Sequence, residues 1–307
     1  MPTPKELYAR QMLDIIARYG TVEDEAARQI ANLLRQARLE INASIGASSE
    51  SGQIQLGALR ANIDAILAGF EAQAASGIDA TIRDVFTLGG SSAVKPLQAI
   101  GVPGVAYWQP SAATLNILTG FSADLVTAVT ADVRMAVNRQ VQLASLGQIT
   151  PFQAMKNLSQ TFGDAGIKQG ATVVSTGITA KAERVIRTEV GRVFNAGNFS
   201  QMKELGERGV VKGLLKRWIA TGDSKTRASH LRIHNETRVK PIPWDEPFKL
   251  HTPGKPVALL MFPQDPAGPA YETINCRCSQ VSIHPAVGVI GSPLDGQIAA
   301  ELKRREA

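Results

Sequence analysis

The chain of 307 residues is 44% hydrophobic and 20% charged, which is typical of an ordered, soluble protein with one large or two ordinary domains. Aromatic residues make up only 5%, which favours helices packed through Ala, Leu, Ile and Val over a β-sandwich. The two cysteines are one residue apart and cannot close a structural loop, so the composition excludes a disulfide-built scaffold and favours a reducing compartment. The longest uncharged stretch, 96–123, is broken by prolines and glycines, which excludes a membrane span there.

The net charge of +6 is concentrated in one segment. Residues 177–240 contain 14 Lys and Arg against 6 Asp and Glu, whereas the flanking regions are nearly balanced. Such a segment can meet nucleic-acid phosphates or an acidic protein surface, and the alternative is a solvated helix face. Aromatic residues do not interleave with the basic ones, so any DNA contact is expected to be non-specific. The candidates for phosphate contact are Lys181, Arg184, Arg192, Lys203, Arg208, Lys212, Lys216 and Arg217.

The first third of the chain carries apolar residues at helical spacing. Residues 5–45 predict a helical hairpin, because Gly20 followed by Thr21 interrupts the apolar run. The first residues lead into this amphipathic segment and not into an apolar one, so we expect no secretory signal. A Ser- and Gly-rich patch follows, and the next helix is expected to end at Gly77.

The stretch 78–111 is rich in Gly and Pro, which predicts irregular chain or short strands. Its uncharged surface, with Tyr107 and Trp108, either docks a partner or packs beneath the helices. We favour packing. Further helices are expected over 122–146 and 179–206, and a capping box with Pro at the first helical position predicts another helix start at Thr150.

The sequence pattern changes after Gly213 from helical spacing to short apolar runs. Strands are expected at 214–220, 257–262 and 278–283, joined by Pro- and Gly-rich turns. The predicted fold class is therefore α+β and mostly α, with a helical N-terminal region before a small α+β module that has short strands. We expect three parts along the chain. They are a helical partner-binding region at 1–176, a compact module at 177–285 and a tail at 286–307.

A polar cluster lies within this module. All four histidines (His230, His234, His251 and His284) and both cysteines fall after residue 229. His230 and His234 share one face if they lie on a helix, and Cys276 and Cys278 point to one side of an extended strand. These four residues have the ligand count of a zinc site, although the Cys-x-Cys spacing and the charge of Arg277 fit zinc poorly.

Two other interpretations use the same residues. An enzyme could employ His230 or His234 as general base, Asp223 or Glu272 to orient it, and Arg227 or Arg277 to hold an anion. Alternatively, Asp, Arg and His side chains form a buried hydrogen-bonded network that stabilises a module with little regular core. We favour the network, because the cluster has neither a nucleophile elbow nor a phosphate-binding Gly loop.

Short motifs in this region occur in a distinctive order. They are Arg187-Thr-Glu189, Asn195, Lys216-x-Trp218, Asp223-x-x-Thr-Arg227-x-x-His230, Phe248, Pro263-x-Asp265-Pro and Ile274-Asn-Cys-Arg-Cys278. Together they resemble the phage head morphogenesis family, the minor head proteins similar to the F protein of phage Mu. The upstream residues 146–151 also resemble the stretch before this domain, whereas residues 1–110 match no motif.

The resemblance bears on the polar residues. Some relatives carry Cys-x-x-Cys where this chain has Arg227-Ala-Ser-His230, and others carry Arg-x-x-His as here. The lack of that cysteine pair in this chain weakens the case for zinc. The resemblance implies a structural network, to which we assign Arg187, Glu189, Asp223, Arg227, His230, Asn275 and Arg277.

The resemblance also implies a function. We expect a minor capsid protein, made in the host cytoplasm and located in the virion head at the portal vertex, that assists head assembly, DNA packaging or genome delivery. Its expected partners are the portal ring, the major capsid or scaffolding protein, and packaged DNA, without a cofactor or a membrane. The alternatives are a nuclease or transferase that uses His230, Asp223 and Arg227, and a zinc-binding adaptor.

Overall fold

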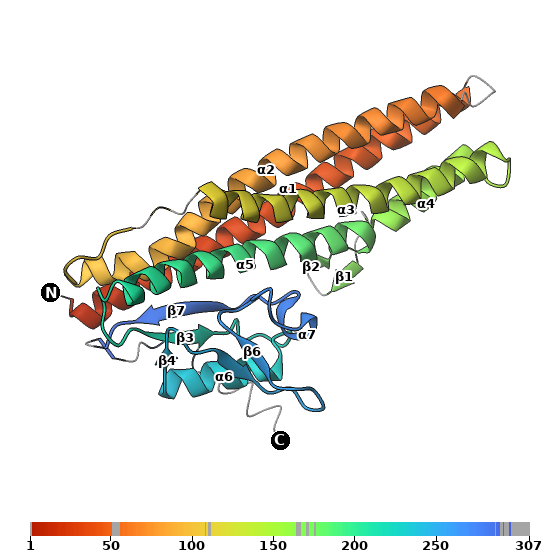
Figure 1. Ribbon diagram of the computed structural model, residues 1–307. Helices are drawn as coiled ribbons and strands as arrows, with labels where there is room; N and C mark the ends of the chain where they lie inside the picture. Colours follow the sequence, from red (N-terminus) through yellow and green to blue (C-terminus); the bar gives the residue numbers. More distant parts are fainter. Residues whose placement is uncertain are drawn as a thin grey trace. The chain divides into compact units, whose positions relative to one another are not determined.

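The computed structural model describes residues 2–50, 56–107, 109, 112–163, 167–169, 172–174, 176–285, 287–288, 291 and 295 (Figure 1). Its helices are α1 (Pro4–Glu50), α2 (Leu56–Ala99), α3 (Ala112–Ser145), α4 (Pro151–Phe162), α5 (Gly177–Glu207), α6 (Ala228–Val239) and α7 (Ala270–Thr273). Its strands are β1 (Ile167–Gln169), β2 (Thr172–Val174), β3 (Leu215–Ile219), β4 (Ile242–Pro243), β5 (Phe248–Leu250), β6 (Ala258–Leu260) and β7 (Ser279–Ile283). Long helices with a few short antiparallel strands confirm the predicted α+β, mostly α class. None of the helices in the described part of the chain is long and apolar enough to cross a membrane.

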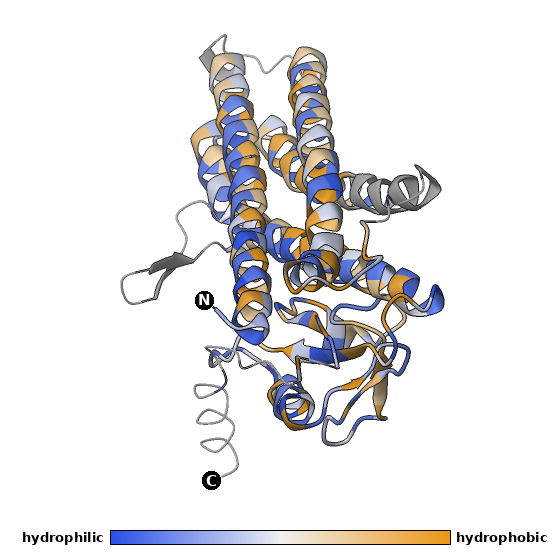
Figure 2. Cartoon of the chain, turned by 90° about the vertical axis from the view of Figure 1, so that its left-hand side faces the viewer, coloured by the Kyte–Doolittle hydropathy of each residue, from blue (hydrophilic) through white to orange (hydrophobic). Residues whose placement is uncertain are grey.

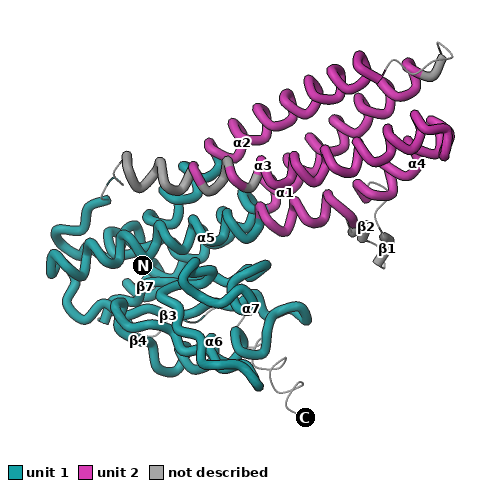
Figure 3. Tube along the Cα trace, turned by 45° about the vertical axis from the view of Figure 1, so that its right-hand side comes forward, with its two compact units in different colours: residues 1–23, 81–115, 187–307 teal, residues 24–80, 116–186 magenta. Residues whose placement is uncertain are grey.

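The chain forms two compact units that do not follow its linear order (Figure 3). Unit 1 combines residues 1–23, 81–115 and 187–307, and unit 2 combines 24–80 and 116–186. The start of α1, the end of α2 and most of α5 therefore belong to the same compact unit as the C-terminal strands. The division at residues 176 and 285 remains a prediction about function. Most of the tail, 286–307, lies outside the described residues.

The predicted hairpin near the N-terminus is wrong, because α1 runs without interruption through Gly20 and Thr21. The Thr21 hydroxyl donates a hydrogen bond to the carbonyl oxygen of Ala17 at 3.3 Å, one turn back along the helix. A threonine that bonds in this way stays within a helix at little cost. The buried residues on both sides of this point, Tyr19 and Ile30 among them, continue one apolar face.

The expected helix end at Gly77 and the expected irregular stretch after it are also wrong as far as Ala99, where α2 ends. Gly89 lies where a Cβ atom would collide with the carbonyl oxygen of Phe194 on α5. Likewise, a Cβ atom at Gly197 would collide with the carbonyl oxygen of Phe86 on α2. These glycines allow the backbones of α2 and α5 to approach closely. The glycines of this stretch therefore serve helix packing and do not mark a chain break.

Other expected elements are confirmed. α3 includes the predicted helix at 122–146, although it starts earlier, at Ala112. Thr150 caps α4, because its hydroxyl accepts a hydrogen bond from the backbone N–H of Gln153 at 3.1 Å, and Pro151 is the first helical residue. The three predicted strands correspond to β3, β6 and β7, whereas β1, β2, β4 and β5 were not foreseen.

Unit 2 is a helical bundle with an apolar interior. Figure 2 shows hydrophobic and hydrophilic residues interleaved along these helices. The buried side chains that they contribute are mostly aliphatic, and include Leu34, Ile41, Leu67, Val133, Val137 and Leu158. Polar links between helices lie nearer the surface, as between Arg134 and Asp64 at 2.6 Å. Burial of an apolar stripe on each helix therefore accounts for the bundle.

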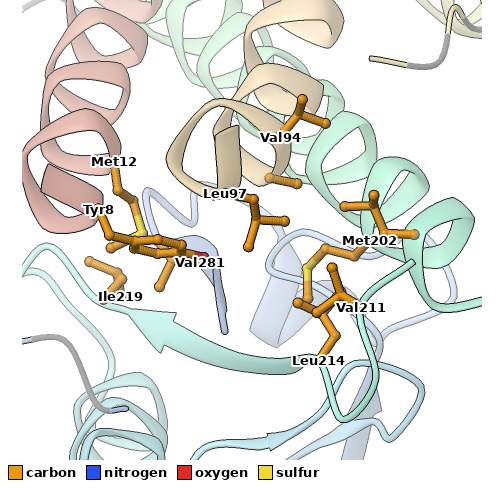
Figure 4. Close-up of a cluster of buried hydrophobic side chains, with 11 residues drawn as sticks. Tyr8, Met12, Val94, Leu97, Met202, Val211, Leu214, Ile219 and Val281 are labelled. Atoms are coloured by element: carbon orange, nitrogen blue, oxygen red, sulfur yellow. The ribbon is translucent and has the colours of Figure 1, made fainter. Parts of the chain in front are cut away.

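Unit 1 is built on a three-stranded antiparallel sheet of order β4-β3-β7. Its first hydrophobic cluster joins the sheet to three helices: Tyr8 and Met12 come from α1, Val94 and Leu97 from α2, and Met202 from α5 (Figure 4). The sheet and the chain leading to it contribute Val211, Leu214, Ile219 and Val281. The Tyr8 hydroxyl also donates to the main-chain oxygen of Ser282 at 3.0 Å. The first helix thus completes the core of the C-terminal module.

A second hydrophobic cluster lies among β3, α6 and the β5-β6 hairpin. Trp218 is fully buried in it and meets the rings of Phe248 and His230 edge-on. Cys276 and Cys278, which immediately precede β7, complete the cluster. The polar site described below is therefore enclosed by an apolar shell.

Candidate functional site

The candidate site brings together residues from α6, α7 and the segment before β7. His230 lies in the first turn of α6, Glu272 lies in α7, and Cys276 and Cys278 lie in the extended segment that leads into β7. Each of these four side chains is at most 2% exposed. Residues separated by more than 40 positions in the sequence thus form one enclosed polar cluster.

The His230 ring is bonded on both sides. Its Nε2 atom lies 2.9 Å from the carboxylate of Glu272, and its Nδ1 atom lies 3.3 Å from the sulfur of Cys278 and 3.5 Å from that of Cys276. The Glu272 carboxylate also accepts hydrogen bonds from the hydroxyls of Ser229 and Thr252. Since the Glu272 carboxylate accepts a hydrogen bond from the Nε2–H group, Nδ1 is the ring atom that faces the two cysteine sulfurs.

The protonation states of these groups are linked. Burial disfavours a charged imidazole, but the Cys278 thiolate and Glu272 outweigh it and raise the pKa of His230. Burial also opposes ionisation of Cys278, yet hydrogen bonding from Cys276 and the charge of His230 hold its pKa well below the usual value. Burial and the neighbouring Cys278 raise the pKa of Cys276. Negative charge on the Cys278 sulfur and positive charge on the His230 ring therefore stabilise each other.

The segment that carries the cysteines is held by buried amides. The Asn195 side-chain amide donates to the main-chain oxygen of Cys278 at 3.1 Å and to Gln264 Oε1 at 2.7 Å. Gln264 in turn donates to the main-chain oxygen of Cys276. Gln264 adopts a positive φ of 62°, a backbone conformation that costs a non-glycine residue free energy. A Cβ atom at Gly191 would collide with this amide, so a small residue is needed there.

Asp223 and Arg277 form an ion pair beside this centre. Asp223 accepts hydrogen bonds from Arg277 and Thr226, and Arg227 donates to the main-chain oxygen of Ile274. Burial raises the pKa of Asp223, but the bonds from Arg277 and Thr226 outweigh it and lower the pKa overall. Arg277 thus points to Asp223, and its charge is compensated there.

The remaining members of the predicted network lie further from His230. Arg187 is 3.7 Å from Glu23, and Glu189 pairs with Arg192 at 2.7 Å. The backbone N–H of Asn275, which has a positive φ of 57°, donates to the hydroxyl of Thr188 at 2.9 Å. These contacts tie α5 to α1 and to the cysteine segment.

His234 does not join the other three residues of the predicted zinc set, so that four-residue set is wrong. It lies one turn beyond His230 on α6, where its Nδ1 atom accepts a hydrogen bond from the backbone N–H of Ala220 at 3.2 Å. Its Nε2 atom lies 3.0 Å from Asp295, which also pairs with Arg217. Burial and the charge of Arg217 lower the pKa of His234 to about 4, so the ring is neutral and Nε2 donates to Asp295.

Two of the predicted phosphate-contacting residues are misassigned, because Lys216 and Arg217 are almost completely buried in β3. The Lys216 ammonium donates to the main-chain oxygen of Met261 at 2.8 Å and lies over the ring of Phe248. Burial lowers its pKa to about 7. β3 is the central strand of its sheet and is buried on both faces from Lys216 to Ile219, which a count of basic residues does not reveal.

The other basic candidates lie on α5 or just after it. Arg192 is partly buried against Glu189 and Gln264. Lys181, Lys203 and Arg208 are more than half exposed, and each pairs with a carboxylate. Arg184 and Lys212 are also exposed. Part of the positive charge of this segment is thus compensated within the protein.

The sequence did not reveal the roles of Glu272 and Gln264. Glu272 was one of two carboxylates considered for orienting His230, and the structure identifies it as the one that does so. Gln264 lies inside the Pro263-x-Asp265-Pro motif, but a glutamine between two prolines carries no signal of a buried, bridging amide. Chemically, the cluster offers two cysteine sulfur atoms and an imidazole in an enclosed space.

The comparison with protein families matches this part of the chain. Residues 148–281 match the model described as Phage Mu protein F like protein, from just before α4 to the middle of β7. No curated protein and no solved structure matches the chain. The matched segment contains the capped helix α4, the buried amides and the Cys276–Cys278 segment. Residues 148–281 are therefore similar to the phage Mu F-like proteins, a likeness that indicates a phage head morphogenesis protein.

Proposed function

We propose that this protein is a minor capsid protein of a tailed phage that docks at the portal vertex and assists head assembly, DNA packaging or genome delivery. The observation that carries the proposal is the family match over residues 148–281. The enclosed His230 cluster agrees with a structural role, because its side chains are at most 2% exposed and offer a substrate no access. A rigid module with a helical region suits a part of a larger assembly.

The direct experiment is to follow the protein through particle assembly. We expect it in purified mature particles and in complexes isolated through the portal ring. The reference is an equally abundant cytoplasmic protein from the same lysate, which should be absent from both. A chain that is found neither in particles nor with the portal would contradict the proposal.

We assign partner docking to the helical region. Leu146 and Phe152, at the turn between α3 and α4, are each 71% exposed, although both are large and apolar. Exposed apolar side chains at one turn are suited to a protein partner. We expect the double variant Leu146→Asp and Phe152→Asp to stay folded and to lose portal association at least tenfold. The matched control is Leu259→Asp on β6, where the replaced leucine is 54% exposed.

Contact with packaged DNA is expected to use exposed basic residues of unit 1. Replacing Lys203 and Lys212 with Gln should weaken binding to mixed-sequence DNA. The logarithmic salt dependence should become shallower by about two, because each lost phosphate contact contributes about 0.9 to the slope. Replacing the exposed Lys249 and Lys255 with Gln is the charge-matched control. If the two double variants show equal salt-dependence slopes for DNA binding, the assignment of phosphate contact to Lys203 and Lys212 is contradicted.

A further inference from the structure

The sulfur atoms of Cys276 and Cys278 and the Nδ1 atom of His230 lie within 4.8 Å of one another. The two sulfur–nitrogen distances are 3.3 and 3.5 Å. In a tetrahedral zinc site with bonds of about 2.3 Å to sulfur and about 2.0 Å to nitrogen, a sulfur and a nitrogen ligand are about 3.5 Å apart. The two sulfur–nitrogen distances are therefore those of metal ligands around a common centre.

The Nε2 side of the His230 ring has the hydrogen-bond partner that a metal-binding histidine commonly has. Its Nε2 atom is bonded to Glu272, which Ser229 and Thr252 hold in place. A metal-binding histidine commonly donates its second ring N–H to a carboxylate, which fixes the tautomer and makes the free nitrogen a better ligand. In the neutral tautomer that carries its proton on Nε2, the lone pair of Nδ1 is directed at the two sulfur atoms.

Groups that stabilise charged sulfur surround the cysteines. The backbone N–H of Cys278 donates to the sulfur of Cys276 at 3.4 Å. The indole of Trp218 is buried beside Cys278 and interacts with its side chain by hydrogen bonding. N–H groups near the sulfur atoms stabilise thiolates, the form in which cysteine binds metals.

The positive charge between the two cysteines is no obstacle. Arg277 projects to Asp223, at 2.5 Å, whereas Cys276 and Cys278 face His230. The main-chain oxygens of both cysteines are fixed by buried amides, those of Gln264 and Asn195. The ligands are therefore held in place by packing and second-layer bonds, as a metal site requires.

We propose that Cys276, Cys278 and His230 bind one zinc ion, with a non-protein ligand such as water in the fourth position. Two thiolates with an imidazole are a ligand set that suits zinc. On binding, the protons carried by the two sulfur atoms and by Nδ1 of His230 pass to the solvent, and no electron is transferred. The ion would tie the start of α6 to the segment before β7. This inference concerns the module itself and does not depend on the portal association proposed above.

Metal analysis of the untagged full chain tests the proposal. After loading with zinc and dialysis against metal-free buffer, the wild-type protein should retain about one equivalent. Cys278→Ser and His230→Gln should each retain less than a tenth of that amount. His251→Gln, which replaces an exposed histidine outside the cluster, is the control and should bind as the wild type does. A wild-type protein that retains only traces would overturn the proposal and leave a hydrogen-bonded thiol pair.

A cobalt titration of the wild-type protein covers the case in which these variants do not fold. Co²⁺ should produce an intense thiolate-to-cobalt absorption band that saturates at one equivalent and disappears on addition of zinc. The Cys276→Ser variant, which retains one thiolate, should show the band at about half its intensity. Absence of the band from the folded wild-type protein would refute metal binding, whatever the variants do.

Discussion

The two compact units bury different kinds of side chains. In unit 2, the polar or charged residues that are buried among those described are two threonines, Thr130 and Thr179. In unit 1, amides, imidazoles and charged groups are enclosed next to the hydrophobic clusters, among them Asn195, His230 and Glu272. Unit 1 thus depends on directional bonds in a way that unit 2 does not.

The difference teaches how much each unit constrains its sequence. An apolar core accepts side chains of similar volume, because dispersion and the hydrophobic effect have little directionality. A buried polar network needs every donor and acceptor matched, since an unpaired group loses its solvation without compensation. We expect unit 2 to tolerate shape-conserving substitutions and unit 1 to reject them.

The largest loss of stability is expected on replacement of Asn195. Its side chain makes four hydrogen bonds, to Gly191, Gln264, Cys278 and Gln280. The nearly isosteric Asn195→Leu should destabilise the protein by about 3 to 5 kcal/mol, because buried backbone groups lose their partners. Denaturant unfolding followed by circular dichroism measures this change.

The matched control is Asn157→Leu in unit 2, which replaces a partly buried asparagine that bonds to Gln140 and Gln153. Its cost should stay below about 1 kcal/mol, because water can replace these bonds. Equal costs for the two substitutions would remove the distinction between the units.

Substitutions of Leu158 on α4 test how strictly the apolar core of unit 2 selects the shape of a side chain. It is fully buried in unit 2. Leu158→Ala should cost about 2 to 4 kcal/mol through lost burial and a cavity, whereas Leu158→Met should cost less than about 1.5 kcal/mol. The same denaturant measurement compares the two variants. If Leu158→Met lowers the free energy of unfolding as much as Leu158→Ala does, the apolar core of unit 2 is as specific for side-chain shape as the polar network of unit 1.

The pH dependence of stability tests the neutral state of His234. Its folded pKa of about 4 lies below that of an unfolded histidine, so the unfolded chain takes up the proton first as the pH falls. Stability is therefore complete above about pH 6.5 and decreases toward pH 4, by at most about 3 kcal/mol.

His234→Gln retains hydrogen-bonding groups but does not titrate, so its stability should decrease less over this range than that of the wild type. Comparing the two unfolding profiles removes the contributions of His230 and Glu272, which both proteins share. Parallel profiles would show that His234 does not titrate at a depressed pKa.

The smallest effect is expected at the N-terminus of α4. Thr150→Ala removes the hydroxyl that accepts the N–H of Gln153 and should cost about 1 kcal/mol. Thr150→Ser retains the cap and should be nearly neutral. A thermal unfolding curve for each variant measures the difference. A cost well above 2 kcal/mol for Thr150→Ala would mean that this surface helix end contributes as much as a buried network bond.

The sequence predicted local features best. The cap at Thr150, the helix containing Val133 and Val137, and the strand around Trp218 depend on spacing and on neighbouring residues. The break expected at Gly77 and the irregular chain expected around Gly89 failed, because glycine marks either a chain break or a close helix crossing. Periodicity cannot distinguish the two, since the second depends on a helix more than 100 residues away.

The sequence by itself determined the fold class, the capped helix and the likeness of residues 148–281 to phage Mu F-like proteins, since these follow from patterns carried by neighbouring residues. Only the tertiary structure decided that Glu272 and not Asp223 orients His230, that His234 lies apart, and that Lys216 is buried. These outcomes depend on contacts between distant segments, where a shared residue type offers several partners and packing selects one.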